Sequence, residues 1–239
     1  MKYNIFLLLF STICTTGKSQ HSTYVGVDAY VSHDIYKIQD ENNLLIHSPI
    51  LSGSDGLIIR QEMNKNISIE TGLFFKLYYK GFGISGFPES RFSNSATQSF
   101  QIPFRLNSKV ILGNGKFSIG PRIGYVFCIN NSFNNGAASG STRFMDGLTL
   151  YGYHEISNYS LTKTFSLLET SIGLEFIVFK QAILTVSPTY FMGFTKLIEL
   201  DINYQRFGSP PHIASAHNKG QNLSLGIGLR FPISGIWTK

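Results

Sequence analysis

Two long segments of alternating residues, joined by a glycine-rich turn, constrain the fold more than any other part of this chain. They lie between Ser99 and Asn130, and Leu112-Gly113-Asn114-Gly115 connects them. A period of two predicts β-strands with two chemically different faces. Asn-Gly between such strands predicts a tight hairpin, because both residues tolerate positive φ. Each segment reaches the roughly 9–11 residues that a tilted strand needs to cross a bilayer. The hairpin therefore indicates a transmembrane β-barrel.

The same alternation recurs along the chain and indicates eight strands in total. The hairpin supplies two, and the other six are expected at about 23–32, 51–63, 66–82, 164–179, 182–197 and 221–231. Short turns alternate with long polar connections between these segments, as in outer-membrane barrels. We predict an all-β fold, an eight-stranded antiparallel up-and-down transmembrane β-barrel with both chain ends at the periplasmic rim.

Four long polar loops are expected at the opposite, cell-surface rim, at residues 33–49, 83–96, 131–163 and 199–220. The longest, 131–163, is rich in Asn, Gly and Ser. The run at 148–153 within it suggests strands that continue beyond the membrane. Its tyrosines, Tyr151, Tyr153 and Tyr159, weakly favour partner binding over a plain surface loop.

The amino terminus is predicted to be a cleaved secretory signal peptide, residues 1–19, which leaves 20–239 as the barrel domain. Lys2 precedes an apolar run that is too short to span a membrane, and Gly17 and Ser19 supply small residues before the cut. Removing residues 1–19 leaves 18 basic and 14 acidic residues, a net charge of +4. The basic residues are scattered, so nucleic-acid binding is unsupported. Cys128 is then the single cysteine, which excludes an intramolecular disulfide.

Alternation alone does not say which face of the strands points inward. A soluble lipocalin-like barrel would place the apolar face inside and a face rich in Lys and Glu outside. Here the polar face is mostly Gly, Ser, Thr and Asn, and the apolar face is almost free of charge over whole strands. Small residues suit the narrow lumen of an eight-stranded barrel. We therefore predict that the apolar face contacts lipid.

A set of charged residues falls on the predicted inner face. It comprises Asp28, Glu70, Lys76, Arg105, Lys109, Arg122, Glu169, Glu175 and Arg230. Because a lone buried ion costs several kcal/mol, these groups should pair. We interpret them as a plug of salt bridges; a proton or ion path is the alternative. Arg122→Met is expected to destabilise the barrel, with Glu70, Glu169 and Glu175 as candidate partners of Arg122.

Three short motifs resemble the PorT-like outer-membrane β-barrel family. They are Lys80-Gly81, Gln101-Ile102-Pro103 and Gly120-Pro121-Arg122-Ile123-Gly124-Tyr125. The resemblance extends over about residues 24–231 and implies a single eight-stranded barrel after a signal peptide. The family's name-giving member is tied to a secretion system, and that role is not carried over to this chain.

The last predicted strand resembles the signal that the outer-membrane insertion machinery recognises. The residues that carry this resemblance are Ser224, Gly226, Leu229 and Phe231. The chain departs from the pattern because residues 232–239 continue past the terminal aromatic. Trp237 in this tail suits a membrane interface.

These features favour a non-enzymatic integral protein of a Gram-negative outer membrane. Its expected partners are the lipid bilayer, the insertion machinery and a protein bound at the surface loops, as an envelope anchor, a binding scaffold or a subunit of an envelope or secretion complex. A barrel-embedded lipid-modifying enzyme is an alternative, but it needs a nucleophile beside a histidine base. The histidines lie in the amino-terminal stub or in predicted loops: His21, His33, His47, His154, His212 and His217. We expect no cofactor and no metal site.

Overall fold

The computed structural model describes residues 22–47, 51–85, 87–113, 115–131, 138–146, 149–160, 162–206 and 210–233. The predicted signal peptide, residues 1–19, and Trp237 lie outside these ranges. No helix in the described part of the chain is long and apolar enough to span a bilayer.

Eight long antiparallel strands close into a barrel. They are β1 (Thr23–Asp34), β4 (Leu51–Glu62), β5 (Ile67–Ile84), β6 (Phe87–Ser108), β8 (Phe117–Asn130), β11 (Thr164–Ile177), β12 (Ile183–Gly193) and β15 (Asn222–Pro232). Each strand pairs with its neighbour in this order, and pairing of β15 with β1 closes the ring. The predicted eight-stranded antiparallel fold is confirmed. A short strand, β7 (Val110–Leu112), continues β6 along β8.

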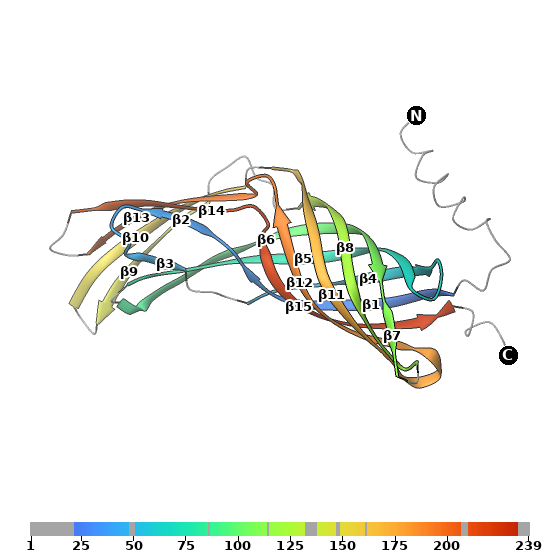
Figure 1. The fold of residues 1–239 in the computed structure, drawn as a ribbon. Helices are drawn as coiled ribbons and strands as arrows, with labels where there is room; N and C mark the ends of the chain where they lie inside the picture. The colour runs from blue at the N-terminus through green and yellow to red at the C-terminus, as the bar shows by residue number, and fades with distance from the viewer. Residues whose placement is uncertain are drawn as a thin grey trace, which may run out of the picture.

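One rim of the barrel carries three tight connections. In the turn between β4 and β5, the side-chain oxygen of Asn64 accepts hydrogen bonds from the backbone amides of Asn66 and Ile67, both at 2.8 Å. Gly113 and Gly115 take positive φ before β8, a conformation that glycine adopts without steric cost. A 3₁₀ turn, Phe179–Gln181, joins β11 to β12. β1 begins and β15 ends at this same rim (Figure 1).

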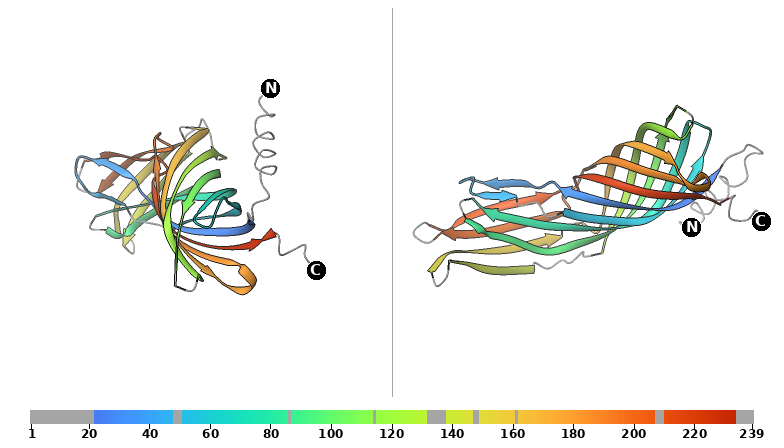
Figure 2. Two further views of the ribbon diagram at one scale, coloured as in Figure 1. Left: turned by 45° about the vertical axis from the view of Figure 1, so that its right-hand side comes forward. Right: turned by 90° about the horizontal axis from the view of Figure 1, so that it is seen from below.

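The opposite end of the barrel extends into a second sheet where long polar loops were expected. Strands β2 (Lys37–Asp40), β9 (Ala138–Asp146), β10 (Thr149–Ser160), β13 (Ile198–Arg206) and β14 (His212–Asn218) form this outer sheet. Their order is β2-β14-β13-β10-β9. β5 and β6 also run past the barrel, and β3 (Leu45–His47) pairs with the end of β5. The result is an elongated molecule with the barrel at one end and the outer sheet at the other (Figures 1 and 2).

One continuous apolar core fills the end of the lumen nearer the outer sheet and continues along the inner side of that sheet. Ile198, Leu200 and Ile202 project into it from β13, and Ala214 and Ala216 from β14. The residues that reach it from the barrel strands form what we call the apolar plug: Tyr78, Val126, Cys128, Phe165, Leu167 and Phe191. This shared core joins the outer sheet to the barrel.

Candidate functional site

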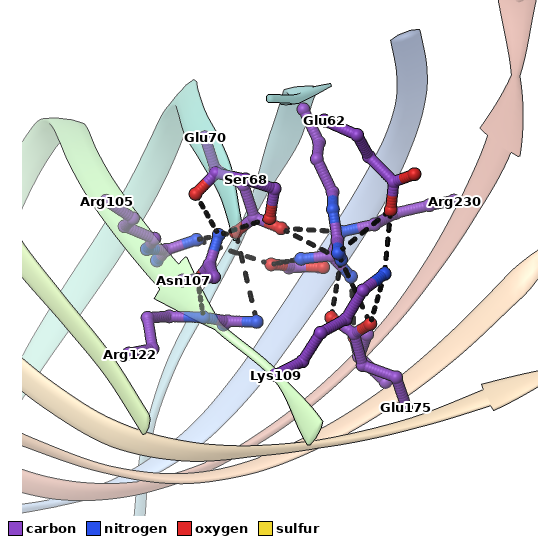
Figure 3. Close-up of polar contacts among 12 residues, drawn as sticks. Glu62, Ser68, Glu70, Arg105, Asn107, Lys109, Arg122, Glu175 and Arg230 are labelled. Carbon is purple, nitrogen blue, oxygen red and sulfur yellow. Dashed lines mark hydrogen bonds and ion pairs between the residues drawn. The ribbon is translucent and has the colours of Figure 1, made fainter. Parts of the chain in front are cut away.

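All nine charged residues predicted for the lumen lie on the inner face of the barrel. Eight are buried, and Lys109 is half-buried near the short-turn rim. They come from six strands and the junction before β7. Figure 3 shows six of them gathered inside the barrel: Glu70, Arg105, Lys109, Arg122, Glu175 and Arg230.

Glu70 on β5 lies at the centre of this network. Its carboxylate is 3.1 Å from Arg230 Nε and 3.7 Å from Arg60 Nη1. Arg105 and Arg122 each approach its other oxygen at 3.9 Å (Figure 3). Four arginines from four different strands thus surround one carboxylate, and Glu70 has no exposed side-chain surface. A group in this position ties the walls of the barrel together.

Asp28 and Glu169 complete the central network. Arg105 Nε donates to Glu169 at 2.8 Å, and Arg230 Nη2 donates to Asp28 at 3.2 Å. Arg230 also donates to the Thr185 hydroxyl at 2.6 Å. Buried charges with several hydrogen-bonded partners are the arrangement that offsets part of the desolvation cost.

Arg122 has weaker ionic contacts than its neighbours. Its Nε donates to the Asn107 side-chain oxygen at 2.6 Å, and its nearest carboxylate is Glu70 at 3.9 Å. Its Nη1 has no hydrogen-bond partner within the described ranges. Of the three predicted candidate partners, Glu70 is the one within ion-pair distance of Arg122.

A second cluster lies at the short-turn rim, where sequence reasoning missed two members. Arg60 binds Glu175 at 2.5 Å, and Lys109 binds Glu62 at 2.7 Å. Arg60 and Glu62 were not predicted to face the lumen. The sequence carries a signal for Arg60, because Leu57 and Ile59 are apolar and lie on the outward face, and Arg60 follows Ile59 and so points to the other face.

A third ion pair lies above the central network, towards the outer sheet. Lys76 lies 3.2 Å from Asp34 and 5.1 Å from the centre of the Tyr78 ring. The Ser52 hydroxyl donates to the same aspartate. Asp34 was also missed, since the first strand was expected to end at residue 32.

With these additions the described part of the lumen holds equal numbers of opposite charges. The carboxylates are Asp28, Asp34, Glu62, Glu70, Glu169 and Glu175, and the cations are Arg60, Lys76, Arg105, Lys109, Arg122 and Arg230. Each lies within 4 Å of at least one opposite charge. The balance argues for a self-contained plug, since a site for an ionic ligand would leave one sign in excess.

Glycine residues make room for the network at the barrel wall. Gly228 lies opposite Asp28 on the neighbouring strand, and a Cβ at this position would overlap the Asp28 carboxylate and crowd Thr185. The small residues on the inner face therefore let the charged side chains lie flat against the wall and reach across the lumen.

The lumen is closed by two chemically different layers. The charged layer fills the part nearer the short-turn rim, and the apolar plug fills the part nearer the outer sheet. Between them lies a cavity of about 10 Å³, lined by Tyr30, Phe74, Arg105 and neighbouring side chains. This is close to the space that a single water requires, about 10–15 Å³. This cavity is therefore far too small to form an aqueous channel at this level of the barrel.

The outer sheet is anchored by Asp40 at the end of β2. Its carboxylate accepts the Tyr204 hydroxyl at 2.9 Å and the amides of Leu44 and Leu45 at 2.8 and 2.7 Å. Partial burial acts to raise the pKa of Asp40, but the hydrogen bonds outweigh it and hold the pKa below its ordinary value of 3.8. Asp40 thus fixes the connection to β3 against β13.

The histidines whose side chains are described all lie away from the inner face of the barrel. His212 contacts the Asn42 amide nitrogen at 2.8 Å, and His33 stacks on His47 with ring centres 5.4 Å apart. His217 is half-buried on the solvent side of β14. Within the described ranges no group of three or more potential metal ligands gathers.

The proposed insertion-signal residues occupy the last barrel strand in the expected alternation. Ser224 and Gly226 face the lumen, whereas Leu229 and Phe231 face outward. Their role in insertion stays a prediction.

Comparison with known proteins gives similarity of fold without close relatives. No family model matches the chain, and no curated protein matches it. Solved structures with a similar fold include OprG from Pseudomonas aeruginosa, with a TM-score of 0.44 and 11% identity over 88% of this chain and 95% of that one. Neisserial surface protein A has a TM-score of 0.41 and 10% sequence identity, over 89% of this chain and 100% of that one. A major outer membrane protein of Thermus thermophilus has a TM-score of 0.43 and 10% sequence identity, over 89% of this chain and 100% of that one.

These similarities describe general architecture, and the closed barrel is established by the strand pairing itself. Membership of the PorT-like family stays a prediction, because no family model matches.

Proposed function

We propose that this protein is a non-enzymatic integral outer-membrane barrel whose sealed lumen anchors the outer sheet as a binding scaffold outside the membrane. The observation that carries the proposal is the continuous apolar core between the plug and the outer sheet. A sheet that shares its core with the barrel is held in a fixed orientation, as a docking surface requires.

The outward surface of the barrel supports placement in a bilayer. Large apolar side chains are exposed on all sides of it: Leu73, Ile123 and Ile172 are each 52% exposed, and Ile227 is 57% exposed. An apolar surface of this extent is far larger than a soluble monomer presents to water. It matches the lipid-facing band of transmembrane barrels. The charged, tightly packed interior also argues against a lipocalin-like ligand cavity.

The exposed side of the outer sheet offers a mixed polar surface. Lys37, Gln39, Asp201 and Asn203 project from it, and Ile213 among them is 75% exposed. An apolar side chain surrounded by polar groups is the arrangement of a small protein-binding surface. A protein partner in an envelope or secretion complex would bind here.

Localisation and conductance test the membrane part of the proposal. The mature protein should fractionate with outer membranes and change gel mobility between unheated and boiled samples. Purified protein should give little conductance in planar bilayers. Recovery as a soluble periplasmic monomer would reject the membrane placement, and a large steady conductance would reject the sealed lumen.

Co-purification from gently solubilised outer membranes tests the scaffold. Wild-type protein should bring down a stoichiometric partner, and Ile213→Glu should lose it while keeping the heat-dependent mobility shift. Ile172→Val, a mild change on the lipid face, serves as the control and should retain the partner. An unchanged partner with Ile213→Glu would exclude this face of the outer sheet.

A further inference from the structure

One charged side chain faces outward on the barrel wall. Asp55 on β4 is exposed and lies on the same face as Leu57 and Ile59. Its cross-strand neighbours are Ala29 on β1 and Phe75 on β5. Among the described side chains of the eight barrel strands, every other outward residue is uncharged. Asp55 therefore interrupts a surface that is otherwise suited to lipid.

Asp55 lies near the middle of the apolar band. It is six residues from Gln61 at the short-turn rim, or about 14 Å along the membrane normal for a strand tilted by about 45°. The whole band is about 25 Å tall. Exposed apolar residues lie on both sides of it, Leu51 towards the outer sheet and Leu57 towards the rim. Interfacial water is thus distant in both directions.

Asp55 has no counter-charge among the residues that the structure describes. Asp55 forms no hydrogen bond or ion pair with any residue in the described ranges, whereas each of the six lumen carboxylates has a cation within 4 Å. An ionisable group in hydrocarbon is costly unless it is paired, and such groups mark functional sites in membrane proteins. The inner face shows that this sequence pairs its carboxylates where structure alone is at stake.

A cavity of about 420 Å³ adjoins Asp55 on the outside of the barrel. It spans β12, β15, β1 and β4, and its side-chain lining includes Val27, Ala29, Leu57, Leu184, Ile227 and Leu229. Ala29 is the smallest outward residue of β1. Small residues allow close approach of a second chain within a membrane.

We propose that Asp55 and this cavity form a docking site, within the bilayer, for a membrane-embedded protein segment that places a lysine or arginine against the carboxylate. Charge complementarity selects this occupant, because a lipid acyl chain would leave the carboxylate unpaired. A second copy of this chain would bring a like charge to the site. The proposal rests on the membrane placement argued above, and it is independent of the outer sheet.

Folding of the purified protein into lipid vesicles gives the first test. With no partner present, Asp55→Leu should increase the folding equilibrium constant about five- to thirty-fold, the equivalent of 1–2 kcal/mol, because it removes an unpaired polar group from lipid. Ile59→Leu on the same face is the control and should leave the constant nearly unchanged. A lower constant for Asp55→Leu would make Asp55 a structural residue and overturn the proposal.

Cross-linking in native outer membranes gives the second test. A photo-reactive residue at position 29 should capture a protein, and one at position 172 on β11, across the barrel, should not. The cross-linked peptide, identified by mass spectrometry, should contain a lysine or arginine within an apolar segment, and Asp55→Leu should abolish the product. Capture of lipid alone, of a second copy, or of a protein regardless of Asp55→Leu would overturn the docking site. These failures leave the membrane placement intact, which fractionation tests separately.

Discussion

The barrel and the outer sheet use opposite hydrophobic patterns in one chain. On β5 within the barrel, Leu73 faces outward and Glu70 faces inward. On β13 of the outer sheet, Leu200 and Ile202 face inward and Asp201 faces outward. Both regions are alternating β-structure with tightly packed interiors. The surroundings of the outer face therefore decide the pattern, because lipid selects apolar residues there and water selects polar ones.

This inversion has a consequence for how each interior is held together. The inner side of the outer sheet is held by apolar packing, which is non-directional, so its side chains need no particular partner. The lumen of the barrel holds charges, and each needs a specific opposite charge at a specific place. Loss of one residue should therefore be more damaging in the lumen.

Arg230→Met is expected to have the largest effect. It leaves Asp28 and Glu70 with fewer cationic partners in a buried site, and breaking such a pair typically costs about 3–5 kcal/mol. The free energy of unfolding from vesicles, measured by denaturant titration, should fall by that amount. Arg122→Met should cost less, because its nearest carboxylate is 3.9 Å away.

A second substitution separates charge from packing. Arg230→Met combined with Asp28→Asn restores equal numbers of lumen charges and should recover part of the lost stability. If the double variant is as unstable as the sum of both single variants, then shape, and not charge pairing, holds the lumen together.

Leu73→Arg and Asp201→Arg test the inversion directly on two outward positions. Leu73 lies at mid-height on the lipid face, so arginine there should reduce the free energy of insertion by about 2–4 kcal/mol. Asp201 faces water on the outer sheet, and the same residue there should change stability by less than about 0.5 kcal/mol. Equal effects at both positions would contradict the assignment of the two environments.

The parts of the fold that were predictable are those with an unbroken alternation. β8 (Phe117–Asn130) begins directly after the predicted turn at 112–115 and ends at Asn130, where the predicted segment ends, because its pattern is regular and glycines mark the turn. The alternation of β4 is less regular, because Asp55 breaks its outward apolar series, and Arg60 was missed with it. The run at 148–153 suggested strands beyond the membrane, and β10 begins within it. The other strands of the outer sheet were missed because their polar residues suggested loops, although Leu200, Ile202 and Tyr204 alternate.

Ion-pair partners could not be derived from the alternation. Glu70 and Arg230 are 160 positions apart in sequence and lie on strands that are not neighbours. Their contact depends on the tilt and stagger of all the strands in a closed barrel. Alternation along a strand shows which residues face the lumen. The position of each side chain along the barrel axis, and the residues that it can contact, follow only from the whole structure.

Gly228→Ala should have an intermediate effect that is confined to the barrel. The added methyl group would overlap the Asp28 carboxylate, and overpacking of this kind costs about 1–3 kcal/mol. The unfolding titration should show this loss. Gly53→Ala, where the nearest atom lies at 3.9 Å, is the matched control and should be nearly neutral. A similar loss at both positions would point to backbone effects of glycine instead of crowding at Asp28.

Tyr204→Phe should have the smallest effect, confined to the outer sheet. It removes the hydroxyl that donates to Asp40, so opening of the segment that holds Leu44 and Leu45 should become easier by about 0.5–1.5 kcal/mol.

Because the pKa of Asp40 is lower in the folded protein than its ordinary 3.8, the contribution of Asp40 to stability is fully present above about pH 3.8 and is lost as pH falls through the folded value. Hydrogen exchange of the Leu44 and Leu45 amides should therefore show weaker protection at low pH, with less of this change in Asp40→Asn. Tyr125→Phe, whose hydroxyl contacts Ser166 on the barrel wall, should leave both amides unaffected. Equal acid sensitivity in wild type and Asp40→Asn would assign the effect to a different group and remove Asp40 as the anchor of the outer sheet.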